Sequence, residues 1–101
     1  MQKISGSQRR YLKSLAHHLK PVVHVGKSGV TDPLINSVTE ALGTHELVKV
    51  KFTDLKDQKA QLAALISTRT ESHLVAILGN TSILYRQNPE LETPKVQLPQ
   101  P

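Results

Sequence analysis

The spacing of apolar residues switches between helical and strand periods several times along this 101-residue chain. Leu12, Leu15 and Leu19 recur at helical spacing, whereas Val48 and Val50 alternate with lysines as in a half-buried strand. Helix and strand segments take turns in the order α-β-α-β-α-β-β. Because each amphipathic segment must bury its apolar face on another, this order predicts helices packed on a sheet.

Capping residues, prolines and glycines indicate where these elements begin and end. The expected helices span residues 7–20, 31–42 and about 58–70, and the expected strands span residues 22–25, 47–53, 73–78 and 82–86. Ser7 is the expected N-cap of the first helix, and Thr31 or Asp32 is that of the second. Pro21 ends the first helix, and Gly43 ends the second. Strand 73–78 has apolar residues on both faces, which predicts a central place in the sheet.

Two β-α-β units imply parallel strands with right-handed crossovers, and Gly79-Asn80 implies a closing hairpin with an antiparallel strand. The predicted fold class is therefore α/β, an α+β sandwich with helices packed on a four-stranded mixed sheet. Residues 1–88 are expected to form one domain. Residues 89–101 contain four of the six prolines and are expected to form an extended tail.

Basic residues are concentrated in the first third of the chain. The formal net charge is +5, yet residues 1–31 hold six basic residues and no acid, while residues 32–101 are close to balance. Arg9, Lys13, His17 and Lys20 form one stripe of the first predicted helix, with Arg10 at its edge. A cationic row without acids favours binding to a polyanion, with a merely solvated helix face as the alternative.

Two further features can meet phosphate. Gly26-Lys27-Ser28-Gly29 lies between a strand and a helix, where glycines let the backbone approach a ligand and Lys27 adds charge. An ordinary turn is the alternative, and we expect the loop itself, rather than the capped helix end, to meet phosphate. Lys49 and Lys51 share one strand face, where they either extend a basic surface or protect a sheet edge.

Other functional classes lack support in the sequence. The absence of cysteine excludes disulfides, thiolate metal sites and a cysteine nucleophile. The five histidines show no ligand spacing, and no serine or carboxylate motif suits catalysis. We therefore expect no enzyme activity, no metal and no cofactor. No apolar run suits a membrane span or a signal peptide, so a cytoplasmic protein without membrane contact is the simplest expectation.

Four ordered segments resemble a known family. They are Leu12–Val23, Val25–Thr31, His45–Lys51 and Leu84–Arg86, and together they cover a match from about residue 7 to residue 86. The chain resembles the CRM domain (chloroplast RNA splicing and ribosome maturation) in the stand-alone bacterial form of the YhbY-like proteins.

The resemblance implies a fold similar to the C-terminal domain of bacterial translation initiation factor three. It also implies RNA binding and association with the precursor of the large ribosomal subunit. The family loop carries over to Gly26, Lys27, Ser28 and Gly29. Nearby basic residues are expected to share the RNA-binding surface, namely Arg9, Arg10, Lys13, Lys20, Lys49, Lys51 and Arg86.

The sequence interpretation is thus an RNA-binding protein that assists ribosome assembly, with ribosomal RNA as its partner and a monomer as its expected state. Two alternatives of other classes stay open. One is a protein–protein adaptor on the ribosome, and the other is a DNA-binding chromatin protein. A membrane-surface helix is disfavoured because the first helix lacks the Trp or Phe usual on such helices.

Overall fold

The computed structural model describes residues 3–100, which contain three α-helices, a short 3₁₀ helix and four strands. In chain order these are α1 (Gly6–Ala16), β1 (Val23–Val25), α2 (Asp32–His45), β2 (Leu47–Phe52), η1 (Lys56–Gln58), α3 (Lys59–Thr70), β3 (His73–Leu78) and β4 (Thr81–Tyr85). The predicted order is confirmed, with η1 as an added turn before α3. None of the helices in this described part has the length and apolar character of a membrane span.

The four strands form one mixed sheet in the order β1-β2-β4-β3. Strand β1 pairs with β2 in parallel, whereas β4 runs antiparallel to both β2 and β3. The mixed sheet is therefore confirmed, but the prediction that strand 73–78 is central is wrong, because β4 is inserted between β2 and β3. Strand β3 is apolar on both faces because helices cover it from both sides.

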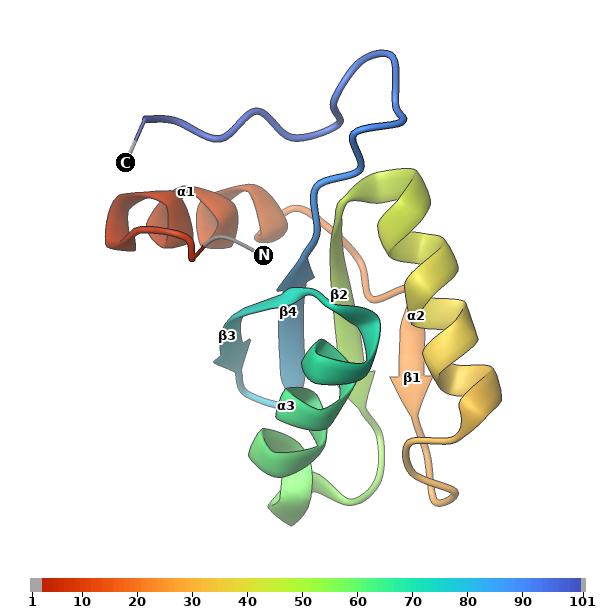
Figure 1. Ribbon diagram of the computed structural model, residues 1–101. Coiled ribbons are helices and arrows are strands. Elements are labelled where there is room, and N and C mark those ends of the chain that lie inside the picture. Colours follow the sequence, from red (N-terminus) through yellow and green to blue (C-terminus); the bar gives the residue numbers. More distant parts are fainter. Residues whose placement is uncertain (1–2, 101) are drawn as a thin grey trace.

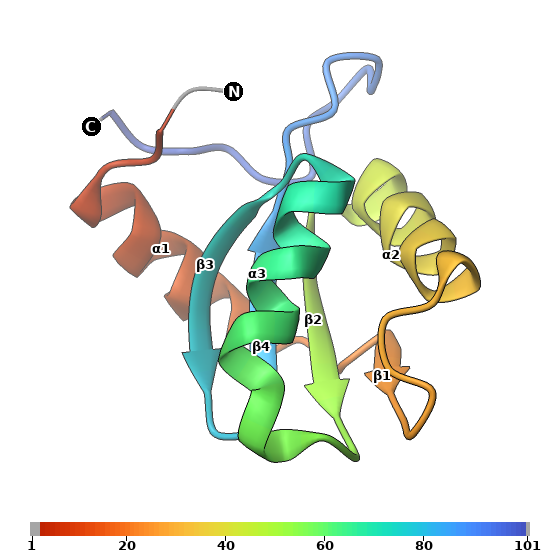
Figure 2. The ribbon, with the colours of Figure 1, turned by 60° about the horizontal axis from the view of Figure 1, so that its bottom comes forward.

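Helices cover both faces of the sheet (Figures 1 and 2). Helices α2 and α3 pack on one face, and α1 packs on the other, behind the sheet in the view of Figure 2. Each face has its own apolar core. The first core includes Val25, Val38, Phe52, Ile66 and Leu84. The second includes Leu12, Ala16, Leu47, Ile83 and Tyr85.

Helix α1 differs from its prediction at both ends. Its N-cap is Ser5 rather than Ser7, because the Ser5 side chain accepts the Gln8 N–H while the Gln8 side chain accepts the Ser5 N–H in a capping box. The helix ends at Ala16 rather than continuing to residue 20. A proline inside a helix clashes with the carbonyl four residues earlier, so Pro21 disfavours a helix that continues beyond the C-cap His17.

Helix α2 runs past its predicted end. Gly43 lies inside its last turn, the helix continues to His45, and its C-cap Glu46 adopts a φ of 63°. The prediction that Gly43 ends the helix is wrong because the carboxylate of Glu46 has a structural use at this position. Glu46 is completely buried and accepts the backbone N–H groups of Asn88, Lys95 and Val96.

The proline-rich tail is attached to the domain through this carboxylate. Residues 89–100 contain no helix or strand, and they run across the end of the molecule at which β4 stops (Figure 1). Val96 is buried in the second core, and Leu98 packs against that core. Three backbone donors to one buried carboxylate, together with one buried valine, hold the tail in place.

Candidate nucleic-acid interface

The glycine loop projects from the end of the sheet at which β1 and β2 stop. The Gly29 N–H donates to the Gly26 carbonyl at 3.0 Å, which closes a four-residue turn with Lys27 and Ser28 exposed at its tip. Gly29 has a φ of 71°, a conformation that favours glycine, and an added Cβ would lie 3.4 Å from Leu55 Cδ1. The turn therefore needs Gly29 and leaves its tip free for a ligand.

The first turn of α2 is capped within the chain. Thr31 Oγ1 accepts the Leu34 N–H at 3.2 Å, as the capping prediction expected. The Thr31 side chain thus satisfies one N–H of the helix start, whereas Lys27 of the preceding loop is exposed.

A polar row crosses the sheet on its α1 face. His24 of β1 is in register with Lys51 of β2, Lys51 is in register with Thr81 of β4, and Thr81 is in register with Leu78 of β3. Val23 and Val25 belong to the core under α2 and α3, so His24 between them lies on the opposite face. Lys51 and His24 are both exposed. This row places a cation next to the glycine loop.

Helix α1 adds cations at the other end of the same row. Arg10 and Lys13 are exposed and line a shallow hollow with a volume of about 430 Å³, which also includes Leu78. We refer to Arg10, Lys13, His24, Lys27 and Lys51 as the basic face. Its members come from α1, β1, β2 and the glycine loop that follows β1.

Two predicted site residues have partners inside the protein instead. Arg9 Nη1 donates to the carbonyls of Leu74 and Val75 at 2.8 and 2.6 Å, and so covers the outer edge of β3. Arg86 donates to the carbonyls of Thr70 and Thr39 at 2.8 and 3.3 Å. Because β4 is antiparallel to β1, Arg86 lies at the opposite end of the sheet from the glycine loop.

Two predicted lysines lie where α1 connects to β1. Lys49 is half-buried, and its Nζ donates to the Leu19 carbonyl at 3.1 Å. Lys20 is exposed and lines a separate hollow with Val22 and Lys95. Lys49 therefore supports the connecting segment, whereas Lys20 lies beside the tail residue Lys95 and outside the basic face.

Sequence reasoning did not select the lysines of the β2–α3 connection, which lies at the same end as the glycine loop (Figure 2). Lys56 is exposed there, while Lys59 Nζ donates to the Gly79 carbonyl at 2.6 Å. Asp54 and Asp57 also lie in this connection, and Asp54 Oδ1 accepts the Leu55 N–H at 2.7 Å. Only the β-α-β topology could have indicated that this connection meets the loop.

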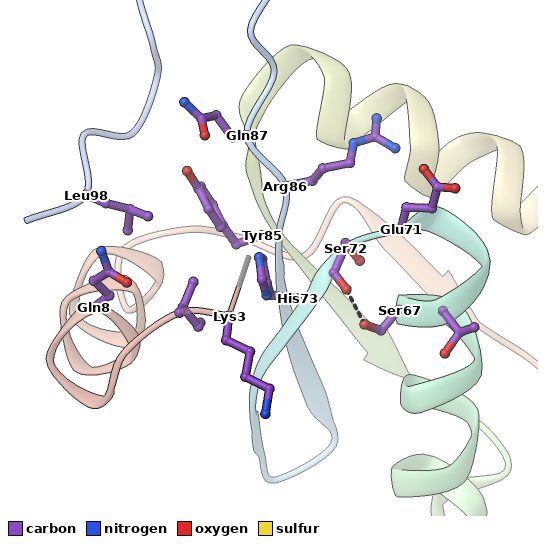
Figure 3. A pocket seen from close by; sticks show the side chains of 12 residues that line it. Lys3, Gln8, Ser67, Glu71, Ser72, His73, Tyr85, Arg86, Gln87 and Leu98 are labelled. Carbon is purple, nitrogen blue, oxygen red and sulfur yellow. Dashed lines mark hydrogen bonds between the residues drawn. The ribbon is translucent and has the colours of Figure 1, made fainter. Parts of the chain in front are cut away.

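A larger hollow, of about 850 Å³, lies at the end of the sheet where β4 stops (Figure 3). The His73 and Tyr85 rings stack there with centroids 6.2 Å apart. Burial, with the nearby Arg9 guanidinium, lowers the pKa of His73, and burial with the Glu46 carboxylate raises the pKa of Tyr85. Because Arg86 in this hollow is bound to helix carbonyls, the hollow holds fewer free cations than the basic face.

Charge pairing leaves the basic face unneutralised. Among residues 3–100 the one ion pair joins Arg69 to Asp32, at 2.8 Å, between the N-terminal end of α2 and the C-terminal end of α3. Residues 3–100 also contain no group of three or more His, Cys, Asp or Glu side chains placed to hold a metal ion.

The comparisons with known proteins agree with this fold. The chain belongs to the CRS1 / YhbY (CRM) domain family, whose model matches residues 4–86. It is 38% identical over 97 residues to the "Probable RNA-binding protein YqeI" of Bacillus subtilis, covering 95% of this chain and 99% of that protein. It is also 38% identical over 100 residues to an "RNA-binding protein" of Haemophilus influenzae, covering 98% of each chain.

A solved structure shows the same architecture. The solution structure of a Staphylococcus aureus protein superimposes with a TM-score of 0.79 and 34% sequence identity, covering 96% of this chain and all of the other. The relatives are matched over nearly their whole length, so they consist of this domain in its stand-alone form. The sequence resemblance to the bacterial YhbY-like proteins is confirmed.

Proposed function

We propose that this protein binds structured RNA through the basic face and the glycine loop. The observation that carries the proposal is that Lys51 of β2 lies in one sheet row with Leu78, which lines a hollow with Arg10 and Lys13 of α1. The exposed loop tip with Lys27 follows β1 at the same end of the sheet. Several fixed cations can each neutralise a phosphate and release its counterions. The names of the Bacillus and Haemophilus relatives support RNA as the polyanion.

Charge and shape carry most of the proposed recognition. A-form RNA presents phosphates and 2′-hydroxyls across a wide, shallow minor groove, which suits a flat cationic face. The sheet row of His24, Lys51 and Thr81 is such a face, and the loop tip at Lys27 and Ser28 projects beside it. The contact is one of binding rather than catalysis.

The central test is the affinity for a structured ribosomal RNA hairpin at several salt concentrations, with duplex DNA as competitor. We expect log affinity to fall linearly with log salt, with a loss of tenfold or more between about 50 and 200 mM. We also expect RNA to compete better than DNA. A flat salt response, or equal competition by DNA, contradicts the proposal.

Lys27→Ala tests the loop within this interface. The variant should bind the hairpin several-fold more weakly and keep its stability within about 0.5 kcal/mol, because Lys27 is exposed at the loop tip. Lys95→Ala is the matched control, since it removes the same charge from an exposed residue of the tail, and the tail crosses the end of the sheet opposite the loop (Figure 1). Equal binding by both variants would show that the loop does not contact RNA.

More specifically, we infer that the RNA is ribosomal and belongs to a precursor of the large ribosomal subunit in the cytoplasm. A monomer with one basic face would assist assembly by holding a structured RNA segment. Sedimentation of cell extracts tests this inference. The protein should travel with precursors of the large subunit, and a Lys27→Ala/Lys51→Ala double variant should shift to the top of the gradient.

A further inference from the structure

The hollow between α1 and the end of β3 differs from the rest of the basic face. Its lining residues are Arg10, Lys13, Ser14, His17, His18 and Leu78. All except Leu78 come from α1 and the turn that follows it. The hollow thus combines two cations, two planar rings and one apolar side chain, whereas the sheet row toward the loop offers mainly polar groups.

The two histidines present planar surfaces in different orientations. His17 and His18 are exposed, and their rings make an edge-to-face contact with centroids 5.3 Å apart and an interplanar angle of 81°. His17 is the C-cap of α1 and keeps helical dihedral angles, and His18 follows it in the turn after the helix. Imidazole rings are among the platforms on which proteins stack unpaired RNA bases.

Leu78 supplies an apolar wall beside these rings. It is the last residue of β3 and is 49% exposed, although the rest of the row that it shares with Thr81 and Lys51 is polar. A single exposed leucine is ordinary on a protein surface. Here, however, it lines the same hollow as the cations of α1 and the histidine rings.

These groups together match the chemistry of one nucleotide. We propose that the hollow binds a single unpaired nucleotide of a structured RNA, with its base against Leu78 and a histidine ring and its phosphate near Arg10 or Lys13. A perfect duplex keeps its bases stacked inside and offers the hollow only phosphate and sugar. This inference rests on the proposed RNA-binding function, and it adds a preference for RNA helices that carry a bulged nucleotide.

The test compares two RNA hairpins that differ only by one bulged adenosine. The wild-type protein should bind the bulged hairpin at least about fivefold more tightly, because each stacked base contributes substantially to affinity. With 2-aminopurine in place of the bulged base, binding should change the fluorescence of that base.

Leu78→Ser is the decisive variant, since a substitution at a half-exposed side chain leaves the cores intact. It should lose the preference for the bulge while keeping its affinity for the unbulged hairpin within twofold. Leu65→Ser is the matched control, because Leu65 is a similarly exposed leucine, 43%, on α3 across the sheet. Leu65→Ser should keep the full preference.

The outcomes separate this inference from the proposed function. Equal affinity of the wild-type protein for both hairpins overturns the nucleotide site and leaves RNA binding in place. An unchanged preference in Leu78→Ser places the unpaired nucleotide elsewhere and also overturns the inference. Binding to neither hairpin overturns both proposals. A His17→Ala variant gives a second measure, with a reduced preference expected.

Discussion

At the scale of single residues, the structure separates cations that face solvent from cations that hold the fold together. Arg9 and Arg86 direct their guanidinium groups at backbone carbonyls, whereas Lys27 and Lys51 are exposed. The planar guanidinium has five donors, so it can satisfy two carbonyls from different elements. The sequence alone does not distinguish these two kinds of cation, because it does not show where the charged end of a long side chain lies in the fold.

Arg86→Ala should therefore act on stability more than on RNA affinity. The change removes donors to the Thr70 carbonyl at the end of α3 and to the Thr39 carbonyl of α2. We expect the free energy of unfolding to fall by about 1–3 kcal/mol in urea titrations. RNA affinity, measured where the variant is folded, should change less than in Lys27→Ala. A larger loss of RNA affinity with unchanged stability would place Arg86 in the interface.

His73 should contribute to the pH dependence of stability. Burial and Arg9 lower its pKa in the folded protein below the unfolded value of about 6.5. The unfolded chain then binds the proton more tightly, so stability is full above the unfolded pKa and is lost as the pH falls through it toward the folded pKa.

The measurement is the urea midpoint of His73→Gln at pH 7.5 and pH 5.5. We expect the variant to lose less stability on acidification than the wild type. If His73→Gln shows the same loss as the wild type, another group controls this pH dependence.

At the scale of elements, helix ends are set by what lies beyond them. Helix α2 passes through Gly43 because the chain must place Glu46 under the tail, and α1 stops at Ala16 because Pro21 forbids a longer helix. In both cases a neighbour in space or sequence decides the boundary. The intrinsic preference of the boundary residue is the weaker influence.

Substitution of two glycines by alanine should change the free energy of unfolding in opposite directions. Gly43 lies in a helical turn with nothing within 4 Å of an added Cβ, so Gly43→Ala should raise the free energy of unfolding by about 0.5–1 kcal/mol. Gly29 has a positive φ and lies close to Leu55, so Gly29→Ala should lower the free energy of unfolding by about 1 kcal/mol or more. Thermal unfolding checks both, and destabilisation by Gly43→Ala would contradict the helical assignment.

At the scale of the whole molecule, the two ends of the sheet carry different segments of the chain. The glycine loop and the β2–α3 connection lie at one end, and the tail crosses the other (Figure 1). Glu46 makes the tail part of the folded structure through three backbone donors. The tail is therefore a folded part of the end opposite the glycine loop.

Truncation after Asn88 tests the role of the tail. It removes the Lys95 and Val96 donors to Glu46 and the buried Val96 side chain. We expect the free energy of unfolding to fall by about 1–3 kcal/mol in urea titrations, while affinity for the unbulged RNA hairpin stays within about twofold. Full stability after truncation would show that the contacts of the tail contribute nothing measurable.

The sequence predicted the elements better than their arrangement. Local spacing placed the helices and strands, the Thr31 cap and the glycine turn, because these depend on neighbours within a few residues. It did not reveal that β4 is inserted between β2 and β3, which requires pairing across the chain. For the candidate site it selected Lys27, Arg10 and Lys51, which stay predictions, but it did not indicate the internal partners of Arg86 or the position of Leu78.

What the sequence determined by itself is the order of elements, the mixed sheet and the cationic first third of the chain, since periodicity, capping and charge are local properties. Only the tertiary structure decided which cations share a surface. Strand direction places Arg86 at one end of the sheet and the glycine loop at the other, and register aligns His24, Lys51, Thr81 and Leu78. Pairing between distant segments creates that row, so no local pattern contains it.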